Sequence, residues 1–269
     1  MPAQYVKPFV TRGKTDAGDA RAITQAMARA DIRPVRVKTA IEQAAAMVLR
    51  TRVFFVRQRA NAINALRGHL TEFGLVADRG IPNVSKLAAA LPKEGDTRIP
   101  PGARLVLGEI IAEIEVLTSR IERIDRQIAS EAKKDNDIRR LTAVPGIGAL
   151  TASTIKAYVP DPAGFKSARH FSAWLGLTPK LNSSGERLRA GRISKMGNPE
   201  LRSLLYMGAM SALLAARRCG TSSAWLRRLI DRRPLKVAAV ALANKTARVV
   251  WALLTKGGDY RAPDKPAEA

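Results

Sequence analysis

A serine-containing stretch set among cations is the first part of the sequence that could do chemistry. Asn182, Ser183, Ser184 and Gly185 are followed closely by several Lys and Arg. Cations beside a serine lower its pKa and stabilise the charge that develops when it attacks a phosphodiester. A Ser-Ser-Gly stretch is also common in ordinary turns, so a loop without a chemical role stays open. On charge and proximity in sequence, we expect phosphate contacts from Arg187, Arg189, Arg192, Lys195 and Arg202.

Two carboxylates near the N-terminus form a second candidate. Asp16 and Asp19 are three residues apart at the start of a predicted helix, where they share one face and could hold Mg²⁺. The same acids could instead complement the helix dipole and its free N–H groups. His69, His170 and Cys219 are the only soft ligands, which excludes a zinc finger.

A Pro-Gly turn between two helical stretches is the third candidate. The segment Leu141 to Val159 contains Val-Pro-Gly-Ile-Gly, which indicates a helix-hairpin-helix element. Gly146 and Gly148 would let the backbone turn tightly and approach a DNA phosphate, and the next helix offers free N–H groups. Such an element grips the DNA backbone without reading sequence. A plain turn between two packed helices is the alternative.

The charge balance favours nucleic acid as the partner. The chain has 46 Lys and Arg against 23 Asp and Glu, a formal charge of +23. Between Leu141 and Gly258 there are nineteen Lys and Arg but only four acids. A polyanion is needed to neutralise such a surplus. We find no apolar run of membrane-spanning length and no signal peptide, and a single cysteine fits a reducing cytoplasm.

Helical periodicity dominates the elements that must position these residues. We expect an amphipathic helix with Ile23 and Met27 on its apolar side, and a long helix from about Thr39 to Phe73. Gly and Pro then mark an irregular connector with a short helix near Ser85–Ala90. A heptad seam follows, which predicts a coiled coil or helical hairpin, most usefully as a dimer contact. The seam residues are Leu107, Ile110, Ile114, Leu117, Ile121, Ile124 and Ile128.

Three strings together resemble one bacterial family. Gly176-Leu-Thr-Pro179, Ser184-Gly185 and the block "GRISKMGNPELRSLL" from Gly191 to Leu205 closely resemble the C-terminal domain of an insertion-sequence transposase family. Its members join a resolvase-like, RNase H-fold nuclease domain to a serine-bearing domain, and some use an element-encoded guide (bridge) RNA. The resemblance implies that Ser184 is the nucleophile, with Ser183 as the fallback.

The N-terminal acids resemble part of the same family's metal site. Lys14, Asp16 and Asp19 look like the end of its Asp-Glu-Asp-Asp set, which implies Mg²⁺ as cofactor. Members begin with a strand-rich segment that carries the first Asp and the Glu, but Met1 stands only fifteen residues before Asp16. We therefore expect most of the RNase H-type sheet to be missing, through a truncated gene or a late start codon. We also expect binding without efficient turnover.

We therefore predict a mostly α chain with an RNase H-type remnant, a coiled-coil insert and an all-helical, serine-bearing transposase domain containing the helix-hairpin-helix element. The predicted boundaries are 1–75 for the remnant, 76–102 for the connector, 103–137 for the coiled coil, 138–258 for the transposase domain and 259–269 for a disordered tail.

The predicted function is transposition by a cytoplasmic, nucleoid-associated homodimer or higher oligomer that cuts and rejoins DNA through the serine, with no membrane partner. The alternative is a non-catalytic DNA-binding protein with a helix-hairpin-helix clamp and a coiled-coil dimer. A ribosome-associated RNA binder ranks last, because Phe, Trp and Tyr make up only 5% of the chain.

Overall fold

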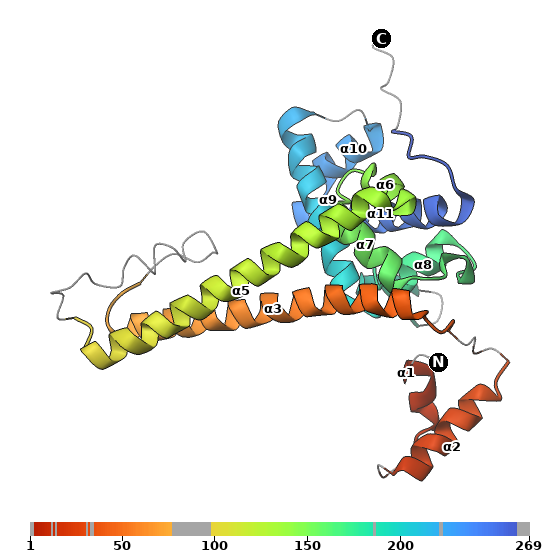
Figure 1. The fold of residues 1–269 in the computed structure, drawn as a ribbon. Coiled ribbons are helices and arrows are strands. Elements are labelled where there is room, and N and C mark those ends of the chain that lie inside the picture. Colours follow the sequence, from red (N-terminus) through yellow and green to blue (C-terminus); the bar gives the residue numbers. More distant parts are fainter. Residues whose placement is uncertain are drawn as a thin grey trace. The chain divides into compact units, whose positions relative to one another are not determined.

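The computed structural model in Figure 1 is predominantly helical over the residues it describes. It divides into two compact units, Met1–Gln43 and Ala44–Ala269. The predicted helix at Ser85–Ala90 lies outside the described residues, as does most of the predicted tail. The structure describes residues 3–11, 13, 15–30, 32, 35–76, 98–184, 187–220 and 223–262, and it describes side chains at these positions except at 3, 4 and 181–190.

The first unit is built from short helices. The hydroxyl of Thr15 caps α2 by accepting a hydrogen bond from the Gly18 N–H at 3.1 Å. Within α2 the small residues Ala22 and Ala26 are buried, while Ile23 and Met27 are 46% and 70% exposed. The predicted helix is thus confirmed. Its buried side is the alanine side and not the side of Ile23 and Met27, because small alanine side chains let neighbouring segments pack closely. The elements are α1 (Ala3–Val6), η1 (Lys7–Phe9) and α2 (Asp16–Met27).

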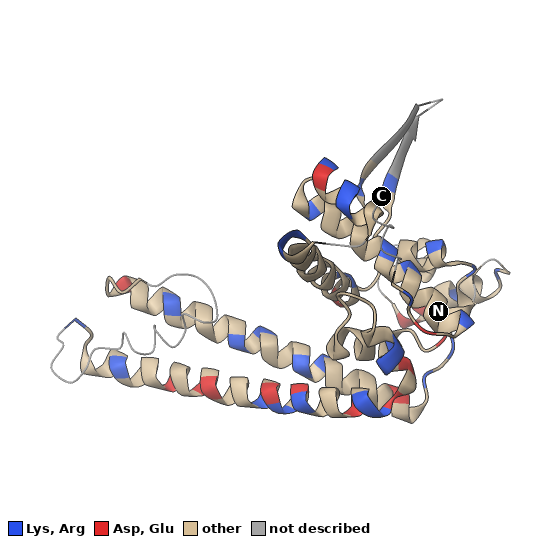
Figure 2. Ribbon diagram, turned by 90° about the horizontal axis from the view of Figure 1, so that it is seen from above, with Lys and Arg blue, Asp and Glu red and all other residues tan. Residues whose placement is uncertain are grey.

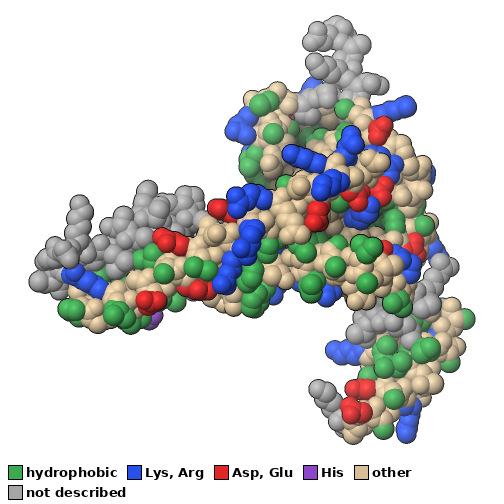
Figure 3. All heavy atoms as spheres, viewed as in Figure 1, with side chains coloured by type: hydrophobic (Ala, Val, Ile, Leu, Met, Phe, Trp, Pro, Cys, Tyr) green, Lys and Arg blue, Asp and Glu red, His purple; other side chains and the backbone are tan. Residues whose placement is uncertain are grey.

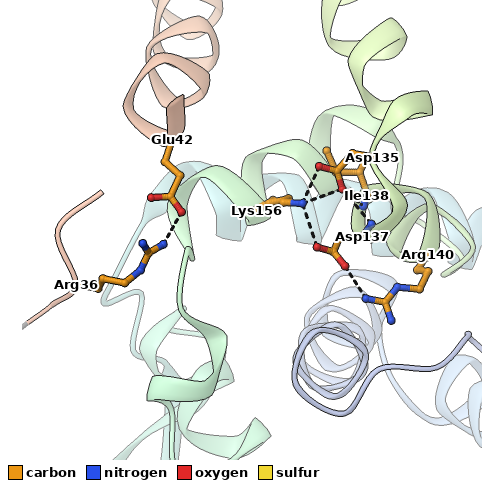
Figure 4. Close-up of polar contacts among 7 residues, drawn as sticks. All are labelled: Arg36, Glu42, Asp135, Asp137, Ile138, Arg140 and Lys156. Carbon is orange, nitrogen blue, oxygen red and sulfur yellow. Dashed lines mark hydrogen bonds and ion pairs between the residues drawn. The ribbon is translucent and has the colours of Figure 1, made fainter. Parts of the chain in front are cut away.

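Residues 1–75 contain no strand in their described part. The long helix α3 (Ala40–Glu72) follows α2 and agrees with the predicted span. Thr39 and Glu42 cap its start reciprocally, since each backbone N–H donates to the other side chain, at 2.8 and 3.3 Å. Arg36 also pairs with Glu42, as Figure 4 shows. The RNase H-type assignment of this region stays a prediction.

In the second unit, α3 and α5 (Pro101–Lys134) form a helical hairpin. All seven residues of the predicted seam are buried or partly buried, and at one end they form a core with Ile63, Leu66 and Leu70 of α3. Arg52 binds both carboxylate oxygens of Asp125 across the pair. The helical-hairpin alternative is confirmed. The seam packs against α3 of the same chain, and the predicted dimer stays a prediction.

The C-terminal part of this unit packs around α11. Ala243, Ala247 and Val250 of α11 are fully buried, and they join Leu205 and Ala209 of α9 in one core. Small side chains on α11 allow its backbone to lie close to α9 and α8. The elements are α6 (Asn136–Thr142), α7 (Ala149–Tyr158), η3 (Pro162–Gly164), α8 (Ala168–Trp174), α9 (Pro199–Cys219), α10 (Ala224–Arg232) and α11 (Leu235–Lys256).

By length and composition alone, α11 could cross a membrane, so the expectation of no apolar run of that length was wrong. Two observations favour a core helix of a folded domain. Its alanine-rich side is buried against α9, and its other side carries Lys245 and Arg248 in the middle of the helix. Charges at that position are costly in a bilayer.

The predicted all-helical C-terminal domain was wrong in one place. β1 (Pro179–Ser184) and β2 (Arg187–Ile193) form an antiparallel two-stranded ribbon. Two sequence signals explain it. Pro179 ends the preceding apolar segment, and residues 187–190 alternate charged with apolar, a period of two that is typical of a strand. Asn182, Ser183 and Ser184 are therefore strand residues and not part of an ordinary turn.

The α6–α7 turn is held by a close approach of two glycine backbones. Gly146 has a φ of +87°, and a Cβ added there would lie 2.5 Å from the carbonyl oxygen of Gly208 in α9. A Cβ on Gly208 would lie 1.8 Å from the Gly146 carbonyl oxygen. Both residues must therefore be glycine. Gly148, by contrast, has open space around it.

The Gly208→Ala variant tests this contact. We expect it to lower the free energy of unfolding by about 1–3 kcal/mol, because the methyl group forces the turn away from α9. Gly108→Ala is the matched control, since Gly108 also lies inside a helix but has nothing within 4 Å. The control should gain about 0.5–1 kcal/mol from helix propensity. Urea denaturation measures both, and equal effects in the two variants would contradict the close approach.

A polar cluster joins the end of α5 to α6 and α7. Lys156 donates to both oxygens of Asp135, at 2.8 and 2.6 Å, and to Asp137 at 3.0 Å (Figure 4). Arg140 donates to Asp137 at 2.6 Å. The hydrogen bond from Lys156, and then that from Arg140, lower the pKa of Asp137. Desolvation lowers the pKa of Lys156, but its bonds to Asp135 and Asp137 outweigh this and raise it.

This cluster predicts an acid-dependent stability. A carboxylate with a lowered pKa contributes fully above its ordinary value of 3.8 and loses that contribution as the pH falls through its folded-state pKa. The stability difference between the wild type and Asp137→Asn should therefore be constant above about pH 5 and shrink below it. Urea unfolding at a series of pH values measures the difference. Glu113→Gln, an exposed change on α5, should show no such trend, and a difference that grows on acidification would contradict the assignment.

Candidate nucleic-acid interface

The base of the two-stranded ribbon lies where two backbone segments, one around Gly176 and the other around Gly197, pass in close contact. We call this contact the crossing. Gly176 and Gly197 both have positive φ, +73° and +81°. A Cβ on Gly176 would lie 2.2 Å from the Met196 carbonyl oxygen, and one on Gly197 would lie 1.9 Å from that of Trp174. The Lys195 N–H donates to the Gly176 carbonyl at 3.2 Å. Two of the strings that carry the family resemblance thus meet here, backbone against backbone.

Side chains from two helices fix this crossing. Arg202 of α9 donates from Nη1 to the carbonyls of Leu175 and Met196, at 3.1 and 3.0 Å. Asn244 of α11 donates to the carbonyl of Leu177 at 3.1 Å. Arg202 therefore has a structural role that sequence reasoning missed, and its predicted phosphate contact stays a prediction.

Asn198 was also missed. Its side chain caps α9 by accepting from the N–H groups of Glu200 and Leu201 at 2.8 and 3.2 Å. The Gly-Asn-Pro order at 197–199 is a helix-start signal that could have identified this cap from the sequence. The cap fixes the point at which the chain leaves the crossing and enters α9.

The predicted nucleophile stands at the far end of the ribbon from this crossing. In the strand register Ser184 pairs with Arg187, and Ser183 pairs with Leu188. Ser184 is the last residue of β1, while Pro179 pairs with Ile193 beside the crossing. The side chains of these serines and of Arg187 and Arg189 lie outside the described set, and Gly185 lies outside the described residues altogether. Their chemical roles stay predictions.

Two predicted phosphate contacts lie near the base of the ribbon. Arg192 is in β2 and Lys195 lies shortly after the end of β2, with a φ of +55°, and both side chains are exposed. The structure thus brings Arg192 and Lys195 onto the same ribbon and crossing as Ser184. The turn with Gly146 and Gly148 is a separate element. Figure 3 shows Lys and Arg side chains together with acids where α5 meets the C-terminal helices, and Figure 2 shows acids interspersed with cations along α5.

Asp16 and Asp19 occupy the first turn of α2 in the first unit. Thr15 supplies the side-chain cap there, and acids in the first turn are also placed where they complement the helix dipole. Among the described residues no group of three or more His, Cys, Asp or Glu is placed to hold a metal ion. Two carboxylates rarely hold Mg²⁺ tightly unless water or phosphate oxygens complete its six ligands. Asp16 and Asp19 alone are therefore an incomplete magnesium site, and their predicted metal role stays a prediction.

A cationic helical unit that holds a two-stranded ribbon on a rigid base is typical of a protein that acts on nucleic acid. Two family comparisons agree with this class. The family described as Transposase IS116/IS110/IS902 matches residues 138–224, and the DEDD transposase family of IS110 type, described as Transposase, matches residues 2–74.

Three relatives extend over nearly the whole chain. A putative transposase of Sinorhizobium fredii is 40% identical over 98% of this chain and 68% of its own length. A probable family 20 transposase of Pseudomonas aeruginosa is 42% identical over 96% and 77%. The transposase for insertion sequence element IS1111A of Coxiella burnetii is 37% identical over 96% and 71%. The chain therefore belongs to the IS110/IS116/IS902 family of insertion-sequence transposases, which supports a general DNA transposase or recombinase role.

Replacing Arg202 and Arg192 separately with alanine tests whether Arg202 stabilises the crossing. Arg202→Ala removes two hydrogen bonds to main-chain carbonyls and should lower the free energy of unfolding by about 1–3 kcal/mol. Arg192→Ala removes an exposed side chain and should leave stability within about 0.5 kcal/mol of the wild type. Thermal and urea unfolding of both variants measure this. Equal stability of the two variants would contradict the structural role of Arg202.

Proposed function

We propose that this chain is an insertion-sequence transposase that cuts and rejoins DNA through Ser184. One observation carries the proposal: the serine ends a strand that pairs directly with the arginine-bearing strand of the same ribbon. Its base is fixed by the crossing of Gly176 and Gly197. Such a ribbon would present a short nucleophile to a DNA backbone while Arg192 and Lys195, at its base, contact phosphates farther along the DNA.

The proposed chemistry is a transesterification. The Ser184 hydroxyl oxygen bonds to the phosphorus of a DNA phosphodiester, and the bond from that phosphorus to one deoxyribose oxygen breaks. The proton that the serine loses balances the one that the leaving hydroxyl gains. Attack by a second strand's hydroxyl on the serine–DNA ester then restores the serine and reseals DNA, so no oxidant or reductant is needed. Cations around the phosphate stabilise the charge of the transition state.

The remaining parts of the family scheme stay predictions for this chain. They are a guide RNA, a homodimer or higher oligomer, and assistance by Mg²⁺ bound to Asp16 and Asp19. The family implies divalent-metal use in general terms. The described residues contain no group of three or more metal ligands, so the proposed chemistry includes no metal step.

A covalent-adduct assay tests the nucleophile. Purified protein is incubated with end-labelled element-end DNA, with and without the element's guide RNA, and is denatured in detergent before electrophoresis. We expect a labelled protein–DNA adduct that Ser184→Ala reduces to background, because no hydroxyl remains to form the ester. Ser183→Ala is the matched control and should retain the adduct. Gel-shift binding should be unchanged in both variants.

The assay also decides between the alternatives left open by the sequence. Loss of the adduct in Ser183→Ala but not in Ser184→Ala would move the role to Ser183. Adduct formation by the double variant would contradict the serine mechanism. DNA binding by the parent chain without any adduct would favour the non-catalytic, helix-hairpin-helix clamp.

A further inference from the structure

An open groove between α8 and α11 is lined by positive charge. It has a volume of about 780 Å³. Four of its lining residues are cations, Arg169, Lys245, Arg248 and Lys256, and none is an acid. The cations come from two segments far apart in the sequence, which is why inspection of local sequence did not group them.

Helix geometry explains why three of the four cations share the groove. Lys245, Arg248 and Lys256 follow one another at three- and eight-residue steps, close to whole turns, so they lie on the same side of α11. The opposite side carries Ala243 and Ala247, which are buried against α9. α8 packs directly against α11 and adds Arg169. The charges therefore converge because the apolar face of α11 must point into the core.

These positive charges lack negative partners. No ion pair among the described residues involves any of the four, and the buried Nε of Arg248 has no hydrogen-bond acceptor. Desolvation, followed by the charge of Arg248, lowers the pKa of Lys245. The Lys245 ammonium lies 4.1 Å from the ring centre of Trp225, which holds it in position. An anion in the groove would relieve this repulsion.

We propose that this groove binds backbone phosphates of duplex DNA. The inference rests on the proposed function, because it assigns a second DNA contact to the same transposase. The groove and the ribbon share their supports: Asn244, next to Lys245, holds the carbonyl of Leu177 at the crossing. DNA held in the groove would thus be positioned relative to the crossing from which the serine-bearing ribbon extends.

Size and chemistry favour duplex DNA. From Lys245 to Lys256, α11 rises about 16 Å, which is several phosphate positions on a duplex. Single-stranded RNA recognition depends on exposed aromatic faces on which bases stack. The lining aromatic residue, Trp251, is partly buried and its indole N–H donates to the carbonyl of Pro162 at 2.9 Å. The groove offers charges but no free stacking platform.

Salt-dependent binding tests the groove. The intact chain and the Arg169→Gln/Lys256→Gln variant are titrated with a 30-base-pair duplex of arbitrary sequence at several salt concentrations. Both substituted side chains are exposed, so folding should be retained, which thermal unfolding checks. The slope of log K against log salt should fall by about 0.9 for each lost phosphate contact, or about 2 in total.

Two control variants sharpen the result. Arg126→Gln/Lys133→Gln removes the same charge from exposed positions of α5 and should leave the slope close to that of the parent. Arg169→Lys/Lys256→Arg keeps the charge and should bind like the parent. Equal slopes for the groove variant and the α5 variant would overturn the groove assignment while leaving the proposed function intact.

Two further outcomes distinguish a failure of the groove assignment from a failure of the proposed function. No duplex binding by the parent chain would overturn the proposed function together with the groove assignment. A loss of binding to a single-stranded RNA of equal length, with duplex binding unchanged, would overturn the assignment to DNA.

Discussion

Close backbone contact at glycine is the constraint on which the C-terminal unit depends. Gly146 meets Gly208, and Gly176 and Gly197 lie across the Met196 and Trp174 carbonyls, at separations that leave no room for a side chain. Such contacts bring backbone polar groups together, so hydrogen bonds from Arg202 and Asn244 must satisfy the carbonyls at the crossing. These glycine contacts and hydrogen bonds consequently hold the α6–α7 turn, the base of the ribbon and the core helices in place.

Electrostatics follows from that packing. The alanine-rich face of α11 is used to approach α9, so its cations are left on the outer side, facing Arg169 of α8. Along α3 and α5, by contrast, charges pair across the hairpin, as Arg52 does with Asp125. The two regions carry similar residue types, yet in the C-terminal groove four cations from α8 and α11 converge with no carboxylate among the lining residues. Packing therefore decides where the surplus charge of the chain is available to a polyanion.

Much of the helical framework could be predicted, because periodicity is a local property. The seam at residues 107–128 and the helix near 39–73 are both present, and the cationic C-terminal region is matched by a transposase family. The errors have local causes too. Pro179 and the alternating residues 187–190 were overlooked as strand signals, and Ile23 and Met27 were assigned to a buried face that alanines occupy.

The sequence by itself determined helix periods, the charge surplus and the order of motifs, all of which depend on neighbours along the chain. The tertiary structure decided which segments touch. It showed that the seam packs within its own chain, that Arg202 binds two carbonyls, and that Arg169 joins Lys245 and Lys256 in one groove. No local pattern predicts these contacts, because they depend on how closely two segments distant in sequence can approach each other. Glycine permits the closest approach, since it has no side chain.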